Sequence, residues 1–168
     1  MRTDRKKTAK YILTVLTIAW CIMIFSFSSV RAIRSNDFTL KKAGFLSSLL
    51  VSGYNEKTIR EQIDINALVH YLLRKAAHIT EFAVLGALLV ADIYLWFKPG
   101  RTALVISSLL TGAAYAISDE IHQYFVPGRS CELKDILIDS AGVTFGVILG
   151  TIVINITKNF SLKKPHRK

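Results

Sequence analysis

The chain has 168 residues, a formal net charge of +10 and 51% hydrophobic residues, and this length suits a single domain, 1–168. Its 22 Lys and Arg residues gather between long apolar blocks, which is typical of a membrane protein. No basic stripe along a soluble fold and no aromatic-rich nucleic-acid motif accompanies them. The composition therefore argues against a nucleic-acid partner and for membrane lipid as the surroundings.

Four apolar blocks are long enough to cross a membrane as helices, and they cover 11–29, 76–97, 103–123 and 136–157. Each has about 19–22 residues, which matches a hydrocarbon core of about 30 Å at about 1.5 Å per residue. No ten-residue stretch alternates with a period of two, so helices are favoured over strands. The first block follows a basic segment, as a signal peptide would, but its length favours an uncleaved helix. The sequence predicts an all-α polytopic membrane protein with four transmembrane helices.

The basic residues predict the orientation. With four spans, the N-terminus, the 98–101 connection and the basic tail share one side, which the positive-inside rule places in the cytoplasm. We therefore expect a multi-pass protein of the cell membrane with both termini cytoplasmic. The short 98–101 connection makes the second and third spans antiparallel neighbours.

The segment 30–73 is then an outer loop, and it is too long to lack structure in a compact domain. Its apolar side chains predict one or two amphipathic helices that lie on the outer membrane surface. A lid that packs on the helix bundle is the alternative, and the sequence does not separate the two. The apolar positions are Phe45, Leu46, Leu49, Leu50, Ile59, Ile63, Leu68 and Leu72.

Two features concern packing between the helices. Gly142, Gly146 and Gly150 repeat at every fourth position of the last span, a spacing that lets helix backbones approach closely. This face could serve the bundle or a dimer, so the oligomeric state stays open. Asp92 lies about 9 Å from the inner boundary, and we expect it either to pair with Lys98 or Arg101 or to snorkel toward that boundary.

Two polar strings, 74–81 and 118–123, interrupt the apolar blocks. His78 lies about 30 Å above the inner boundary of its helix and His122 about as far along the next one. Glu81 and Asp119 are each about 4.5 Å deeper. The heights predict that His78 faces His122 and that Glu81 faces Asp119. Ionisable groups at such depths are costly and tend to be functional.

We call the ionisable groups at this height, first His78, Glu81, Asp119 and His122, the polar layer. Helical spacing adds further residues to it. Arg74 lies one turn above His78, and Asp135 and Asp139 share one stripe at the start of the last span. Glu120 points about 100° away from Asp119, so the two cannot face one centre equally. After this helix, residues 127–128 suit the centre of a type II turn that folds Arg129 back over the layer.

Three interpretations of the layer compete. A divalent metal would take two carboxylates and two imidazoles, namely His78, Glu81, Asp119 and His122. The same four groups could act as general acid and base on an anionic, lipid-linked or surface substrate, which arginines would hold. The third interpretation is an ion-pair network that joins the helices. Taken singly, Lys75, Gln123 and Asp135 are typical of solvated interfacial groups.

The polar strings resemble the two signatures of the VanZ-like membrane proteins, most closely over 73–150. The first consists of Arg74, Lys75, His78, Glu81, Phe82, Leu85 and Gly86, and the second of Ser118, Asp119, Glu120, His122, Gln123, Phe125, Pro127, Gly128 and Arg129, with Asp135 and Gly142 after it. The resemblance implies a bacterial cell-envelope protein associated with resistance to teicoplanin and related glycopeptides, and it implies no particular biochemical activity. Where that family usually has Asn, this chain has Asp139.

Together these observations predict a protein that binds or modifies an anionic, lipid-linked cell-wall component. The predicted acid/base residues are Asp119 and His122, supported by His78 and Glu81. The predicted substrate-binding residues are Arg74, Glu120, Gln123, Arg129, Asp135 and Asp139. A metal-dependent hydrolase and a non-enzymatic interaction or transport protein are the alternatives.

Overall fold

The computed structural model describes residues 2–29, 44–127, 129 and 131–162. Residues 30–43 of the predicted outer loop and Gly128 of the predicted turn lie outside the described residues. Helical turns cover 44–50. The named elements are α1 (Arg2–Ser28), the 3-10 helix η1 (Tyr54–Glu56), α3 (Ile59–Phe97), α4 (Arg101–Tyr124) and α5 (Leu133–Leu162).

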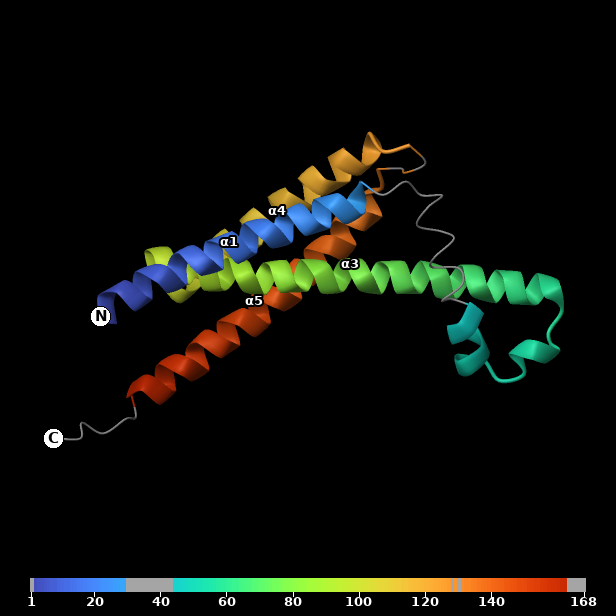
Figure 1. Cartoon of the computed structure of the whole chain (residues 1–168), viewed down its shortest axis with the longest axis horizontal. Helices are drawn as coiled ribbons and strands as arrows, with labels where there is room; N and C mark the ends of the chain where they lie inside the picture. Colours follow the sequence, from blue (N-terminus) through green and yellow to red (C-terminus); the bar gives the residue numbers. More distant parts are fainter. Residues whose placement is uncertain (1, 30–43, 128, 130, 163–168) are drawn as a thin grey trace.

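Four helices of the described chain are long and apolar enough to cross a membrane: Lys7–Ser28, Ile59–Phe97, Arg101–Tyr124 and Leu133–Asn159. Each contains one of the four predicted blocks, except that the first ends one residue earlier than predicted. The prediction of an all-α polytopic membrane protein is confirmed. The start of α1 and the end of α5 lie at the same end of the bundle (Figure 1). We call the other end, where α1 and α4 end and α5 begins, the polar end.

The second span is longer than predicted, because α3 runs without a break for 39 residues. A capping box starts it: Thr58 Oγ1 accepts from the Glu61 N–H, and Glu61 Oε2 accepts from the Thr58 N–H at 2.8 Å. Lys98, in the left-handed region at φ 47°, and the following proline end it. The amphipathic helix predicted around 59–72 is therefore the first half of α3. It continues the span beyond the bundle (Figure 1), whereas we had expected it to lie flat on the membrane.

Glycines bring α3 and α5 into close, parallel contact. A Cβ on Gly142 would lie 2.7 Å from the Ile79 carbonyl oxygen, and one on Gly146 would lie 1.8 Å from the Ala83 carbonyl oxygen. From the other side, a Cβ on Gly86 would lie 2.3 Å from the Val143 carbonyl oxygen. The glycine repeat is thus a packing face inside the bundle. It also sets which residue of α5 stands beside each residue of α3.

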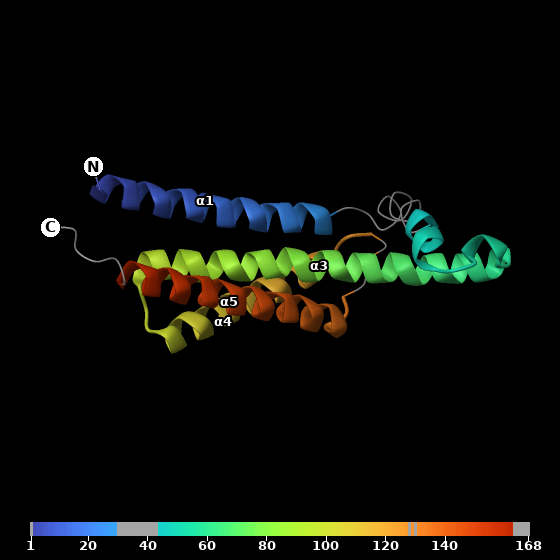
Figure 2. The ribbon, with the colours of Figure 1, turned by 90° about the horizontal axis from the view of Figure 1, so that it is seen from below.

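We call this close contact between α3 and α5 the seam, and the buried core surrounds it. Phe82, Leu85 and Val90 of α3 pack with residues of α4 and α5 and with Ile24 of α1. Figure 2 shows α1 on one side of α3 and α5 on the other. Polar contacts also attach α1, because Tyr115 Oη of α4 donates to the Cys21 carbonyl oxygen at 2.6 Å.

A small polar group joins α1 to α3 near the chain termini. Asp92 does not pair with Lys98 or Arg101, one of the two arrangements we expected; its Oδ1 accepts from Thr14 Oγ1 at 2.8 Å. Trp96 Nε1 donates to the same hydroxyl at 2.9 Å. A hydroxyl that both donates and accepts leaves neither partner unsatisfied, so these contacts explain a carboxylate at this depth.

Candidate functional site

At the polar end, the seam between α3 and α5 carries two acid–base pairs in successive turns. Lys75 of α3 forms an ion pair with Asp135 of α5. One turn deeper, His78 Nδ1 lies 3.4 Å from Asp139 Oδ1, and Asp139 is 1% exposed. Both pairs lie just above the glycines, so the seam that fixes the helix register also places these residues side by side.

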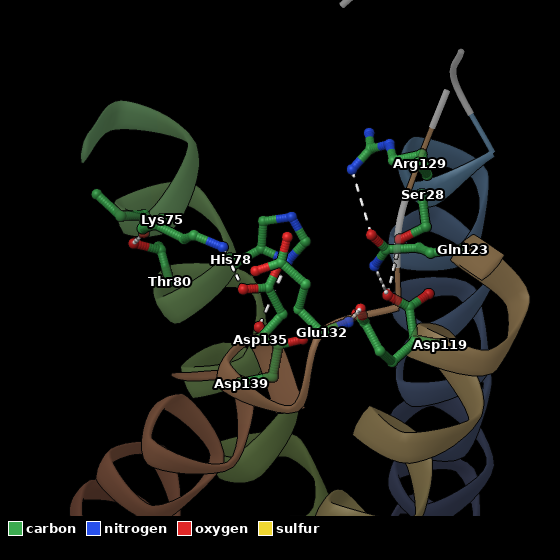
Figure 3. A network of polar contacts seen from close by, with 12 residues as sticks. Ser28, Lys75, His78, Thr80, Asp119, Gln123, Arg129, Glu132, Asp135 and Asp139 are labelled. Carbon is green, nitrogen blue, oxygen red and sulfur yellow. Dashed lines mark hydrogen bonds and ion pairs between the residues drawn. The ribbon is translucent and has the colours of Figure 1, made fainter. Parts of the chain in front are cut away.

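A chain of hydrogen bonds runs across the neighbouring side of the layer (Figure 3). Asp119 Oδ2 of α4 accepts from Ser28 Oγ of α1 at 2.7 Å and from Gln123 Nε2 at 2.9 Å. Gln123 Oε1 in turn accepts from Arg129 Nη1 at 3.3 Å. The amide thus links a buried carboxylate to a guanidinium. Gln123 is 2% exposed, so it is a structural centre of the layer and not the solvated group that its sequence position favoured.

Glu120 is fully buried beside Asp119 but faces a different partner. Its Oε1 accepts from the backbone N–H of Glu132 at 2.7 Å, in the segment that leads into α5. Asp119 instead faces α1 through Ser28. This confirms the expectation that adjacent residues of α4 point in different directions. Together they tie α4 to both of its neighbours.

The predicted pairing of His78 with His122 does not occur. His122 stacks on Phe25 of α1, with ring centroids 3.7 Å apart, and its Nε2 lies 2.9 Å from Ser29 Oγ. His78 faces Asp139 on the other side of the layer. Glu81 is closer to its predicted place, because it lies within electrostatic range of His78, Asp119 and Asp139.

Arg129 folds back over the layer, as the sequence predicted. The Val126 carbonyl oxygen accepts from the Arg129 N–H at 3.0 Å, which closes the turn, and the side chain then reaches Gln123. Burial and the like charge of Arg74 lower the pKa of Arg129 below its usual value, although nearby carboxylates oppose the shift. The two arginines are therefore near enough to repel each other, while Asp119, Glu120 and Asp135 attract the guanidinium of Arg129.

The same geometry bears on the metal hypothesis. Among the described residues, no three His, Cys, Asp or Glu side chains are placed so that they could hold one metal ion. His122 turns toward α1 and His78 toward α5, which separates the four predicted ligands. The arrangement offers no support for a divalent metal here.

Two members of the site were underestimated or missed. Lys75, 9% exposed, is buried at its ion pair, although its position favoured a solvated lysine. Ser28 escaped notice because a serine at the end of an apolar block carries no chemical signature. Its height along the helix was the available signal. Ser28 is the last residue of α1 and lies at the same level as Asp119, which is near the end of α4.

The comparisons with known proteins give one match. No curated protein and no solved structure matches the chain. The family model described as VanZ/LLP1 matches residues 13–154, which includes the second and third spans, most of the first and fourth spans, and the whole polar layer. The chain is therefore a membrane protein that belongs to the VanZ/LLP1 family.

Proposed function

We propose that the polar end binds the anionic group of a lipid-linked cell-wall component, or of another component of the membrane surface, and that the protein thereby contributes to teicoplanin-type resistance. The observation that carries this proposal is the pair Arg74 and Arg129. Their charges act on each other, and Arg129 is half-buried. A phosphate between two guanidiniums removes their repulsion and accepts paired hydrogen bonds from each.

The surroundings of Arg129 support an anion-binding role. Its turn and its bond to Gln123 hold the guanidinium over the layer before any ligand arrives. A group held in place loses less conformational entropy on binding than a free arginine does. The basic residues near both termini favour a cytoplasmic location for those ends. The polar end would then meet the outer leaflet, where lipid-linked cell-wall precursors are exposed.

Binding to a defined probe tests this role. The full chain is placed in phosphatidylcholine nanodiscs and titrated with a short-chain polyprenyl phosphate. We expect Arg129→Gln and Arg74→Gln each to weaken binding at least tenfold. Arg60→Gln, at an exposed position of α3, and Arg101→Gln, at the opposite end of the bundle, are matched controls. Equal affinity in all five proteins would refute the proposal.

The link to resistance needs a cellular measurement. The chain and its variants are expressed at equal levels in a teicoplanin-sensitive Gram-positive host, and the inhibitory concentration is measured. The unaltered chain and Arg101→Gln should raise it, and Arg129→Gln should not. A family member that acts outside resistance would leave the concentration unchanged in every strain, and this result would remove the teicoplanin part of the proposal.

Acid/base action on the bound ligand is a second candidate, and the His78–Asp139 contact favours it. A carboxylate that faces one ring nitrogen orients the imidazole and favours a proton on that nitrogen. We assigned the acid/base role to Asp119 and His122 from the sequence. His78→Asn and His122→Asn, compared in the resistance assay, separate the two assignments. Loss with the first variant alone supports His78, and loss with the second alone supports the original pair.

The metal-dependent hydrolase stays a prediction that no observation of the structure favours. Elemental analysis of the purified chain tests it, and protein without bound metal would end it.

A further inference from the structure

Basic residues mark all four spans at the end of the bundle where α1 begins and α5 ends. The span of α1 starts at Lys7 and that of α4 at Arg101, Lys98 directly follows the span of α3, and Lys158 is the last residue but one in the span of α5. Lys10 lies about one turn farther along α1. We call this end of the bundle, with these five residues, the basic end.

Helix dipoles do not explain this placement. A helix favours cations at its C-terminal end and disfavours them at its N-terminal end. The rule fits Lys98 and Lys158, but Arg101 is the first residue of α4, where a cation is unfavourable. What these residues share is the end of the bundle at which their helices begin or end (Figure 1). The surroundings of the basic end, rather than the individual helices, therefore account for the charge.

Two of the lysines are held over aromatic rings of α3. Lys10 Nζ of α1 lies 4.9 Å from the ring centroid of Trp96, and Lys158 Nζ of α5 lies 4.6 Å from that of Tyr94. The ring faces attract the two cations. Trp and Tyr rings near the end of a span favour the headgroup level of a membrane. The contacts therefore hold both ammonium groups at the level of lipid headgroups, and we call Lys10 and Lys158 the ring-held lysines.

The basic end has cations without matching carboxylates. In the described part of the chain, no carboxylate lies within ion-pair distance of either ring-held lysine, and the ion pairs given for that part lie at the polar end. Asp92, the nearest acidic position of α3, accepts from Thr14. Residues 2–6, at the start of α1, add three basic residues and one acidic residue to the sequence here. Positive charge at headgroup level is therefore left to be balanced from outside the chain.

We propose that Lys10 and Lys158 bind the phosphate groups of anionic phospholipids in the leaflet next to the basic end. Phosphate carries the opposite charge, and its oxygens accept the N–H donors of an ammonium group. The aromatic rings place the two lysines where lipid phosphates lie, which favours a lipid over a soluble anion. This site lies at the opposite end of the bundle from Arg129 and does not rest on the proposed anion site there.

Headgroup preference is the direct test. The full chain in phosphatidylcholine nanodiscs is titrated with short-chain phosphatidylglycerol and short-chain phosphatidylcholine. We expect the glycerol lipid to bind about tenfold more tightly, a preference that two lysines near an anionic surface supply, and added salt should weaken it. Equal binding of the two lipids would overturn the proposal. Soluble glycerol phosphate is a further probe, and binding as tight as that of the glycerol lipid would identify a soluble anion as the ligand and overturn the lipid site.

Paired variants assign the preference to the ring-held lysines. Lys10→Gln together with Lys158→Gln should remove most of it. Lys57→Gln together with Lys134→Gln removes the same charge before α3 and at the start of α5, away from the basic end, and should leave the preference unchanged. Lys10→Arg together with Lys158→Arg keeps a cation over each ring and should also keep it. The melting temperature of each variant checks that it folds.

The outcomes separate this site from the one at the polar end. Equal losses in the two glutamine pairs would show that net charge alone attracts the lipid, and the lysine site would be refuted. Arg129→Gln should leave the glycerol-lipid preference intact. If Arg129→Gln removes the preference and the variant of the ring-held lysines keeps it, the lipid binds at the polar end, so the lysine site fails while the arginine site stands.

Discussion

Gly146→Ala tests whether the seam between α3 and α5 positions the polar layer. The added Cβ would lie 1.8 Å from the Ala83 carbonyl oxygen, whereas ordinary contact begins at 3.4 Å. The helices must therefore separate by about 1.6 Å, the difference between these two distances. The obstacle is backbone, which cannot rotate away as a side chain can. Overpacking of this kind costs about 3 kcal/mol, the upper part of the usual range.

The assay is thermal unfolding in mild detergent, followed by circular dichroism. A loss of about 3 kcal/mol corresponds to a fall of about 6–12 °C in the melting temperature of a chain of this size. Gly150→Ala is a graded control, because its Cβ would meet side-chain atoms of Val90 at 3.2–3.3 Å and the Ala87 Cα at 3.3 Å, both much farther than the 1.8 Å at Gly146. Gly100→Ala is a neutral control, because nothing lies within 4 Å. Melting temperatures that do not follow the order Gly146, Gly150, Gly100 would refute the close parallel packing.

Two more substitutions probe the layer itself. Lys75→Met leaves the Asp135 carboxylate without its cation and should cost about 2 kcal/mol, somewhat less than for a fully buried pair; Asp135→Asn in the same chain should restore at least half of this loss in the unfolding assay. Ser28→Ala removes a hydroxyl donor from buried Asp119 and should cost about 1–3 kcal/mol, whereas Ser28→Thr keeps the hydroxyl, so equal stability of the two variants would contradict the contact.

The height of each polar group could be predicted from the sequence, because helix rise converts residue number into depth. The layer at the polar end was found in this way, and the structure places His78, Asp119 and Asp139 within electrostatic range of one another. The four spans followed from the lengths of the apolar blocks. Both successes depend on distances along one helix, which the rise per residue determines.

The partners could not be predicted in the same way, because height says nothing about rotation around the helix axis. We paired His78 with His122 because they share a level and belong to helices joined by a short connection. The closest packing of α3 is instead with α5, where glycines remove the side chains between the backbones. That contact turns His78 toward Asp139 and leaves His122 facing α1. The continuous first half of α3 was missed because we divided the chain at the change from amphipathic to apolar sequence, although no helix-breaking residue stands there.

The seam and the polar layer act as one unit. Gly142 lies one turn below Asp139 on α5, and the Ile79 backbone that it contacts lies next to His78 on α3. The close approach that these glycines allow therefore brings the two side chains together, and it holds a buried carboxylate that has no hydrogen bond of its own. On the α4 side, Ser28 and Gln123 hold Asp119 in place with neutral donors. The helix packing therefore keeps both carboxylates buried, with Asp119 close to Arg129, which reaches the layer through Gln123.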